Sequence, residues 1–144
     1  MKRLTLLLLS LALVCVAGVG DQPNALLAYS YASELFDLEC GWGKVSERTA
    51  EEVADLVPLT SELLDRLGAE VIRWLSELAE GALGVHPESS AATSTRGTLN
   101  LIARNIERTQ EDLATENYER AANFLSSLRG ATESLAKGYA EYDY

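Results

Sequence analysis

The sequence predicts an all-α protein: an up-and-down, antiparallel four-helix bundle that follows a cleaved signal peptide. Apolar residues recur at intervals of three and four in several stretches, which is the spacing of helices that bury one face. No stretch has the alternating β-branched and aromatic pattern of a strand. The connections are mostly short, which favours antiparallel neighbours. The same pattern allows one alternative, in which helical hairpins complete their core only as a dimer.

The first 20 residues have the composition of a signal peptide. Lys2 and Arg3 give a positive start, an apolar stretch with a single serine runs over Leu6–Val16, and small residues precede Asp21. This order predicts export and a mature chain that begins near Asp21. It places the protein in the periplasm or the extracellular space.

Two other fates of this leader fit the sequence less well. An uncleaved membrane anchor needs about 20 apolar residues, and the apolar stretch of the leader is shorter. Lipidation at Cys15 needs a small residue before the cysteine, and Val14 stands there. We therefore expect cleavage, and no stable membrane span in the mature chain.

Length and charge limit the classes of function. Residues 21–144 have the length of a single domain. The whole chain has 22 acidic and 12 basic residues, and loss of Lys2 and Arg3 leaves 10 basic residues and a net charge of −12. Such a surface repels nucleic acids and anionic membranes. Two explanations of the acidity are open: a partner with a basic surface, or solubility in the envelope or medium, which we favour.

Cys40 is the only cysteine that remains after cleavage, so no disulfide forms within one mature chain. Burial as a small apolar side chain is the commonest fate of a lone cysteine. The alternative is a disulfide between molecules. The protein is therefore expected to be a monomer or a Cys40-linked homodimer.

The first helix is expected to begin at Asp21–Asn24, with proline in its first turn, and to end at Gly41. Its apolar face consists of Leu27, Ala28, Tyr31, Ala32, Leu35 and Leu38.

The second helix is expected to open with a capping box formed by Thr49 and Glu52 and to break or kink at Pro58. It carries the strongest apolar stripe of the chain: Leu64, Leu67, Val71, Trp74 and Leu78, widened by Leu63, Ile72 and Leu75.

The segment from residue 84 to residue 97 is rich in small polar residues and predicts a mobile, exposed loop. The third helix then carries Leu99, Ile102, Ile106 and Leu113, with Thr109 in the gap of the stripe. A break near residues 115–117 leads to the fourth helix, whose apolar positions are Tyr118, Ala121, Ala122, Leu125, Leu128, Leu135, Tyr139 and Tyr142.

The residues that common cofactors require are scarce. The chain has one histidine, His86, and its only methionine is Met1. Carboxylate-bridged metal pairs in bundles need two Glu-x-x-His motifs, and tetrahedral zinc needs several cysteine or histidine ligands. We therefore expect no cofactor, no metal site and no enzymatic activity, with His86 a solvated loop residue.

Two aromatic residues are candidates for binding a partner. Trp42 lies between two glycines, and Tyr144 ends the chain. Exposed tryptophan and tyrosine often anchor protein interfaces. The alternatives are that Trp42 folds back to close the end of the bundle, which we favour, and that Tyr144 belongs to a frayed terminus.

Taken together, these observations predict an exported, non-enzymatic protein that binds a protein partner, as an inhibitor, immunity protein, adaptor or chaperone does. A carrier of lipid or another apolar ligand is the alternative, because amphipathic helices can open and turn their apolar faces outward. A third, weaker hypothesis is an enzyme that uses carboxylates alone, which needs an acid with a perturbed pKa in a cleft.

Overall fold

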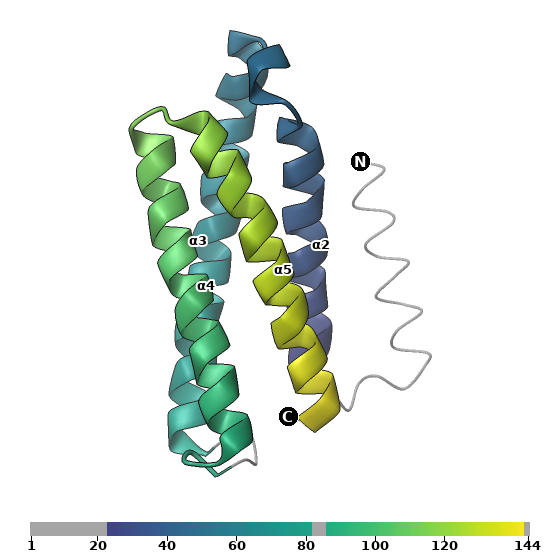
Figure 1. The fold of residues 1–144 in the computed structure, drawn as a ribbon, viewed down its shortest axis with the longest axis vertical. Coiled ribbons are helices and arrows are strands. Elements are labelled where there is room, and N and C mark those ends of the chain that lie inside the picture. The colour runs from purple at the N-terminus through teal and green to yellow at the C-terminus, as the bar shows by residue number, and fades with distance from the viewer. Residues whose placement is uncertain (1–22, 82–85, 143–144) are drawn as a thin grey trace.

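A computed structural model describes residues 23–81 and 86–142 as four long helices packed side by side (Figure 1). The helices are α2 (Pro23–Trp42), α3 (Ala50–Glu80), α4 (Ser90–Ala114) and α5 (Tyr118–Tyr142), and a short 3-10 helix, η2 (Val45–Glu47), joins α2 to α3. Each helix packs against the next, and α5 also packs against α2. The predicted up-and-down antiparallel bundle is confirmed. The expected signal peptide, the expected helix start at Asp21 and the candidate residue Tyr144 lie outside the described residues.

Helix α2 ends later than predicted. It includes Gly41 and runs to Trp42, and Gly43 takes the left-handed conformation with φ of +47°. The backbone N–H of Gly43 donates to the carbonyl of Glu39 over 3.0 Å, which closes the last turn. The prediction of Gly41 as terminator was wrong by two residues, because burial of the Trp42 side chain extends the helix by another half turn.

Helix α3 begins with the predicted capping box. The Thr49 hydroxyl accepts from the Glu52 N–H over 3.1 Å, and the Glu52 carboxylate accepts from the Thr49 N–H over 3.0 Å. Of the predicted break or kink at Pro58, the break does not occur, since α3 continues through Pro58 to Glu80. Pro58 and Ala54 are both exposed, so water can reach the carbonyl that lacks its usual N–H partner.

The loop predicted from residue 84 to residue 97 is shorter than expected, because α4 begins at Ser90. Ser89 caps this helix, and its hydroxyl accepts from the Ala92 N–H over 3.1 Å. Ala92 and Thr95, both expected in the loop, are buried. Because their side chains are small, they form no recognisable apolar stripe in the sequence. Packing against the rest of the bundle buries them and stabilises the helix over these residues.

The predicted break between the last two helices is confirmed. Helix α4 ends at Ala114, and Glu116 takes a left-handed conformation with φ of 61°. The N–H of Asn117 reaches back to the carbonyl of Asp112 over 2.7 Å. Together with the bond from the Glu116 N–H to the Leu113 carbonyl, this bond closes a Schellman turn, in which it is the bond that spans more residues.

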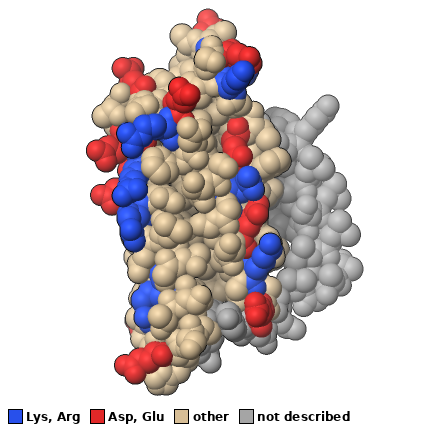
Figure 2. Space-filling model, in the orientation of Figure 1, with Lys and Arg blue, Asp and Glu red and all other residues tan. Residues whose placement is uncertain are grey.

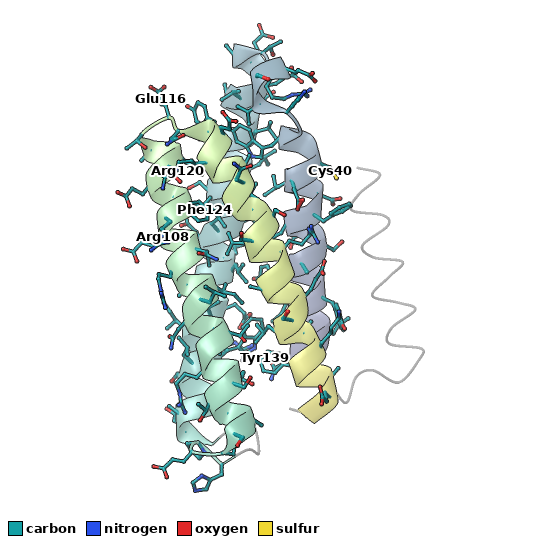
Figure 3. All side chains as sticks on the ribbon, in the orientation of Figure 1. Cys40, Arg108, Glu116, Arg120, Phe124 and Tyr139 are labelled. Atoms are coloured by element: carbon teal, nitrogen blue, oxygen red, sulfur yellow. The ribbon has the colours of Figure 1, made fainter. Side chains whose placement is uncertain are left out.

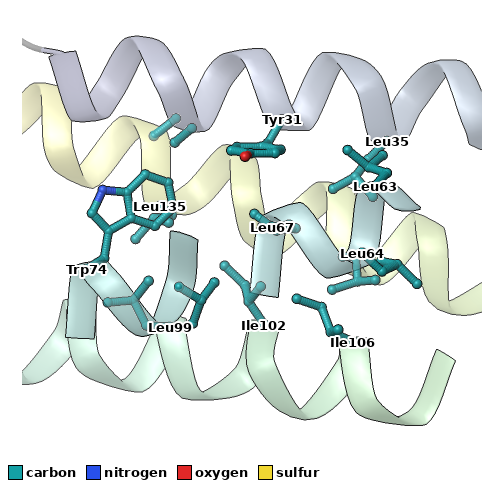
Figure 4. Packing of buried hydrophobic residues seen from close by; sticks show 14 of the residues in the cluster. Tyr31, Leu35, Leu63, Leu64, Leu67, Trp74, Leu99, Ile102, Ile106 and Leu135 are labelled. Atoms are coloured by element: carbon teal, nitrogen blue, oxygen red, sulfur yellow. The ribbon is translucent and has the colours of Figure 1, made fainter. Parts of the chain in front are cut away.

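Aliphatic side chains from all four helices fill the centre of the bundle (Figure 4). The fully buried members include Leu35, Leu64, Leu67, Val71, Leu78, Leu99, Ile102, Leu125 and Leu128. One residue of the predicted apolar stripe of α3 is not buried: Ile72 is 70% exposed on the outer side of the helix. The core is closed within one chain, so the fold needs no partner hairpin to complete it.

A buried tryptophan stands at each end of this core. Trp42 donates its indole N–H to the Thr60 hydroxyl over 3.0 Å and stacks on Tyr118, with ring centroids 5.7 Å apart. At the other end, Trp74 donates to the Asn24 side-chain oxygen over 2.9 Å and packs at a tilt on Tyr139. Both indole N–H groups therefore have a partner, as burial requires.

Candidate functional site

The side chains considered for nucleophilic chemistry are far apart. Cys40 lies on α2 near the end of the bundle where α3 begins (Figure 3). His86 follows the opposite end of α3, where it is exposed and its Nδ1 accepts from the Glu88 N–H over 3.1 Å. Residues 23–81 and 86–142 contain no group of three or more histidine, cysteine, aspartate or glutamate residues placed to hold a metal ion.

One carboxylate lies deeper than expected for a solvated helix face. Asp112 on α4 is buried, and its Oδ2 lies 3.8 Å from the Nε of Arg120 on α5. Arg120 and Glu116 lie near the same end of the bundle (Figure 3). The arrangement is an ion pair across the α4–α5 turn.

Trp42, which the sequence offered as a partner-binding residue, is fully buried. Its ring packs on Tyr118 and its N–H binds Thr60, so no part of the side chain is open to a partner. The expectation of an exposed anchor is corrected. The alternative, that Trp42 closes the end of the bundle, describes what is seen.

Cys40 is the reverse case: its side chain is exposed and its thiol is free. The expectation of a core thiol is corrected. The reason is its position on the helix, since Trp42 and Leu38 point into the core and Cys40 points to the other side of α2.

Apolar and small residues follow two opposite sides of α2. One side forms the core and includes Ala28, Tyr31, Leu35, Leu38 and Trp42. The other side, called here the outer α2 face, consists of Leu26, Tyr29, Ser33, Phe36 and Cys40. Tyr29 is 43% exposed and Phe36 is 50% exposed. This face was not among the predicted apolar faces, although its residues have the same spacing as the core residues, offset by two positions.

A shallow groove of about 300 Å³ runs beside the outer α2 face. Tyr29, Ala32, Ser33 and Phe36 line it from α2, and Glu133 and Lys137 line it from α5. It is open to solvent along its length.

Arg129 on α5 contacts both Phe36 and Glu39 of α2 beside this groove. Its guanidinium lies over the Phe36 ring, 5.5 Å from the centroid, and binds Glu39 over 2.7 and 3.4 Å and Glu133 over 3.1 Å. The hydrogen bonds to Glu39 and then to Glu133 raise the pKa of Arg129. Arg129 therefore balances the charge of Glu39 and Glu133 beside this groove.

Negative charge is concentrated on α3. This helix has eight acidic and two basic residues, whereas α4 and α5 each have three of either sign. The face of the molecule seen in Figure 2 shows charges of both signs along its edges and an uncharged centre. The two arginines of α3 already bind acids: Arg66 binds Glu34 over 3.0 Å, and Arg73 binds Glu70 and Glu77.

The solvent side of α3 forms an acidic face with two large apolar residues in it. We define the α3 acidic face by six exposed residues: Glu51, Asp55, Leu59, Glu62, Ile72 and Glu80. Their spacing places all six on one side of the helix, together with the exposed Arg66 and Arg73, whose guanidinium groups bind Glu34, Glu70 and Glu77. Leu59 is 53% exposed, and the four acids form no salt bridge with any residue of the described ranges.

A second groove, of about 460 Å³, lies where the start of α3 meets the start of α5. Its floor is apolar, with Val53, Val57 and Tyr118, and Arg48 and Glu116 stand at its rim. Arg48 binds Glu52 through one terminal nitrogen over 3.0 Å, while its buried Nε donates to no described group.

No described helix is long and apolar enough to cross a membrane. Comparison of the chain with protein-family models, with curated proteins and with solved structures gives no match.

Proposed function

We propose that this chain is an exported, non-enzymatic helical bundle that binds a protein with a basic surface through the α3 acidic face. The inhibitor, immunity, adaptor and chaperone classes all fit this description. The observation that carries the proposal is the combination of unpaired acids with exposed Ile72 and Leu59 on one face of a rigid helix.

The chemistry of the face supports a protein partner over a small ligand. Carboxylates without a cation attract a basic surface and speed its approach. Ile72 and Leu59 add apolar area that is removed from water on docking. Such desolvated side chains supply much of the binding free energy of an interface. The face lies along one long helix, and none of its residues lines either of the two grooves. A small molecule would therefore find little enclosure there.

A non-enzymatic role is supported by the separation of the reactive groups. The thiol of Cys40 and the imidazole of His86 lie toward opposite ends of the bundle. A cysteine nucleophile needs its base within hydrogen-bond reach.

Site-specific photo-crosslinking tests the proposal directly. A photoreactive residue at Ile72 is compared with one at Leu101, which is also exposed and apolar but lies on α4. In cells that export the protein, we expect an adduct of one defined mass from Ile72 and none from Leu101. Equal labelling at both positions, or no adduct at Ile72, would overturn the proposal.

Charge reversal then tests the electrostatic part. Asp55→Lys with Glu62→Lys is expected to abolish the Ile72 adduct. Glu107→Lys with Glu119→Lys makes the same change in net charge on exposed positions of α4 and α5, and should leave the adduct intact.

The groove at Arg48 supports a second candidate function, a carrier of an anionic amphiphile. Val53, Val57 and Tyr118 offer apolar contact, and the positive charge of the Arg48 guanidinium, which also lines the groove, attracts a carboxylate or phosphate head. Native mass spectrometry of the exported protein tests it. An added lipid mass that disappears in Arg48→Leu would support the carrier, and a bare chain mass would exclude it.

A further inference from the structure

The outer α2 face has the spacing of a coiled-coil seam. Leu26, Tyr29, Ser33, Phe36 and Cys40 follow one another at intervals of three, four, three and four residues. In a heptad these are positions a, d, a, d and a. The larger core residues of the same helix fall at positions c and f, and the buried Ala25 and Ala32 fall at position g, beside the d residues of the seam. Helix α2 therefore has one seam inside the bundle and a second seam that faces outward.

We propose that a second copy of this chain pairs in parallel along the outer α2 face, and that a disulfide between the two Cys40 residues locks the pair. Parallel pairing about a twofold axis sets each a or d residue opposite its own copy. Cys40 then meets Cys40 of the partner chain, and Phe36 meets Phe36. Antiparallel pairing in register would set Cys40 against the start of the helix, near Leu26, where no thiol is available.

The distances of such a pair suit a disulfide. Packed helix axes lie about 8–10 Å apart, and Cα atoms lie about 2.3 Å from each axis. Facing Cα atoms therefore come within roughly 3.4–5.4 Å of each other, which overlaps the usual span of about 4.4–6.8 Å across a disulfide.

The charges beside the outer α2 face favour a second copy over a strongly basic partner. Glu39 and Glu133 are both bound by Arg129, and Glu34 is bound by Arg66. Figure 2 shows acidic and basic side chains alternating along one edge of the described surface. Asp37, at position e beside the seam, is the acid of α2 that forms no salt bridge with a described residue. The repulsion between two acidic chains is therefore smaller at this face than at α3, so the two surfaces suit different partners.

The area of the face explains why the disulfide is needed. Helix α2 has 20 residues and is about 30 Å long. A strip about 10 Å wide along it covers roughly 300 Å² on each copy, against the about 800 Å² per partner of a standard interface. The non-covalent pair is therefore weak, and its contribution is to set the register in which the two thiols meet.

The covalent step is thiol–disulfide exchange with a disulfide donor of the oxidising compartment, such as a dithiol oxidoreductase in its disulfide form. One Cys40 thiolate attacks the donor disulfide, forms a mixed disulfide and releases one donor thiolate. The second Cys40 thiolate attacks the Cys40 sulfur of that mixed disulfide and releases the other donor thiolate. One donor disulfide is thus reduced to two thiols, which take up the two protons lost from the Cys40 pair.

Equilibration with oxidised and reduced glutathione tests the proposal. The exported protein is incubated in this buffer at micromolar concentration, alkylated, and analysed by mass spectrometry for covalent dimer and for glutathione adduct. Phe36→Glu places like charges across the seam and is expected to lower the ratio of dimer to adduct at least tenfold. Ile72→Glu makes the same change at an exposed position of α3 and should leave the ratio unchanged.

Two further variants secure the interpretation. Phe36→Leu keeps an apolar d residue and should retain the dimer, while Cys40→Ser should leave a monomer in dilute solution. Glutathione adduct without dimer in the unaltered protein would overturn the proposal, as would equal dimer yields from Phe36→Glu and Ile72→Glu. Because the α3 acidic face is a different surface, failure here leaves the proposed function standing, and the reverse also holds.

Discussion

Removal of the hydroxyl of Thr60 tests the packing of the bundle end in detail. Thr60 is fully buried, accepts the indole N–H of Trp42 over 3.0 Å and donates to the carbonyl of Leu56 over 2.7 Å. Thr60→Val keeps the shape of the side chain and leaves the buried N–H without an acceptor. An orphaned buried donor costs about 1–3 kcal/mol.

The chain offers a matched control for this substitution. Thr132 on α5 is also fully buried, and its hydroxyl donates to the carbonyl of Leu128 over 2.7 Å, but it accepts from no indole. Thr132→Val therefore carries every change of Thr60→Val except the orphaned N–H. We expect Thr60→Val to lower the free energy of unfolding by about 1–2 kcal/mol more than Thr132→Val does, or roughly 4–8 °C in Tm.

Urea and thermal unfolding followed by far-ultraviolet circular dichroism measure this difference. A double-mutant cycle with Trp42→Phe isolates the bond, because phenylalanine has no N–H to orphan. In the Trp42→Phe background, Thr60→Val and Thr132→Val should cost the same. Equal costs already in the unaltered protein would refute the reasoning, because loss of the Thr60 hydroxyl would then carry no cost for the Trp42 indole N–H.

Three further predictions follow from the helix ends and the core. Glu116→Gly relieves the left-handed φ of 61° and should raise the free energy of unfolding by about 0.5–1 kcal/mol in urea titrations, whereas Glu116→Ala should give no gain. The hydrogen bonds from the backbone and then the side chain of Thr49 lower the pKa of Glu52 below 4.5, so its contribution to stability is full above that value and is lost as the pH falls through the lowered pKa. Thermal unfolding across this range should therefore show a smaller acid-induced drop in Tm for Glu52→Gln than for the unaltered protein, and parallel curves would contradict the capping-box account. Leu67→Ala opens a cavity at a fully buried position and should cost about 2–5 kcal/mol in the same urea assay, so a cost below 1 kcal/mol would show that the site is not packed as described.

The features that the sequence predicted well are local ones. The capping box of Thr49 and Glu52 forms between groups three residues apart, so its pattern is visible in the chain itself. The stripe that includes Leu67 and Trp74 needs only the helical period to align it, and it is buried as expected. Net charge and cysteine count likewise come from the residues alone.

The candidate sites depended on which side of a helix faces the bundle. Cys40 and Trp42 are two residues apart on α2, and the sequence expected the first in the core and allowed the second on the surface. Trp42 is buried, as the favoured alternative had it, but Cys40 is exposed, because α2 has apolar residues on two sides and its packing against α3 and α5 selects one of them. Periodicity defines a face but does not say which of two similar faces is buried.

Sequence alone thus determined the number of helices, their order, the capping box at Thr49 and the acidity of the chain, because each of these depends on neighbours along the chain. Only the tertiary structure decided that Ser90–Gly97 is helical, that Ile72 is exposed and that the unpaired acids share a face with it. These outcomes depend on contacts between residues distant in sequence, such as Trp42 with Thr60 and Trp74 with Asn24. The free energy of those contacts exceeds the weak local preferences of small and polar residues, and it sets which surfaces remain for a partner.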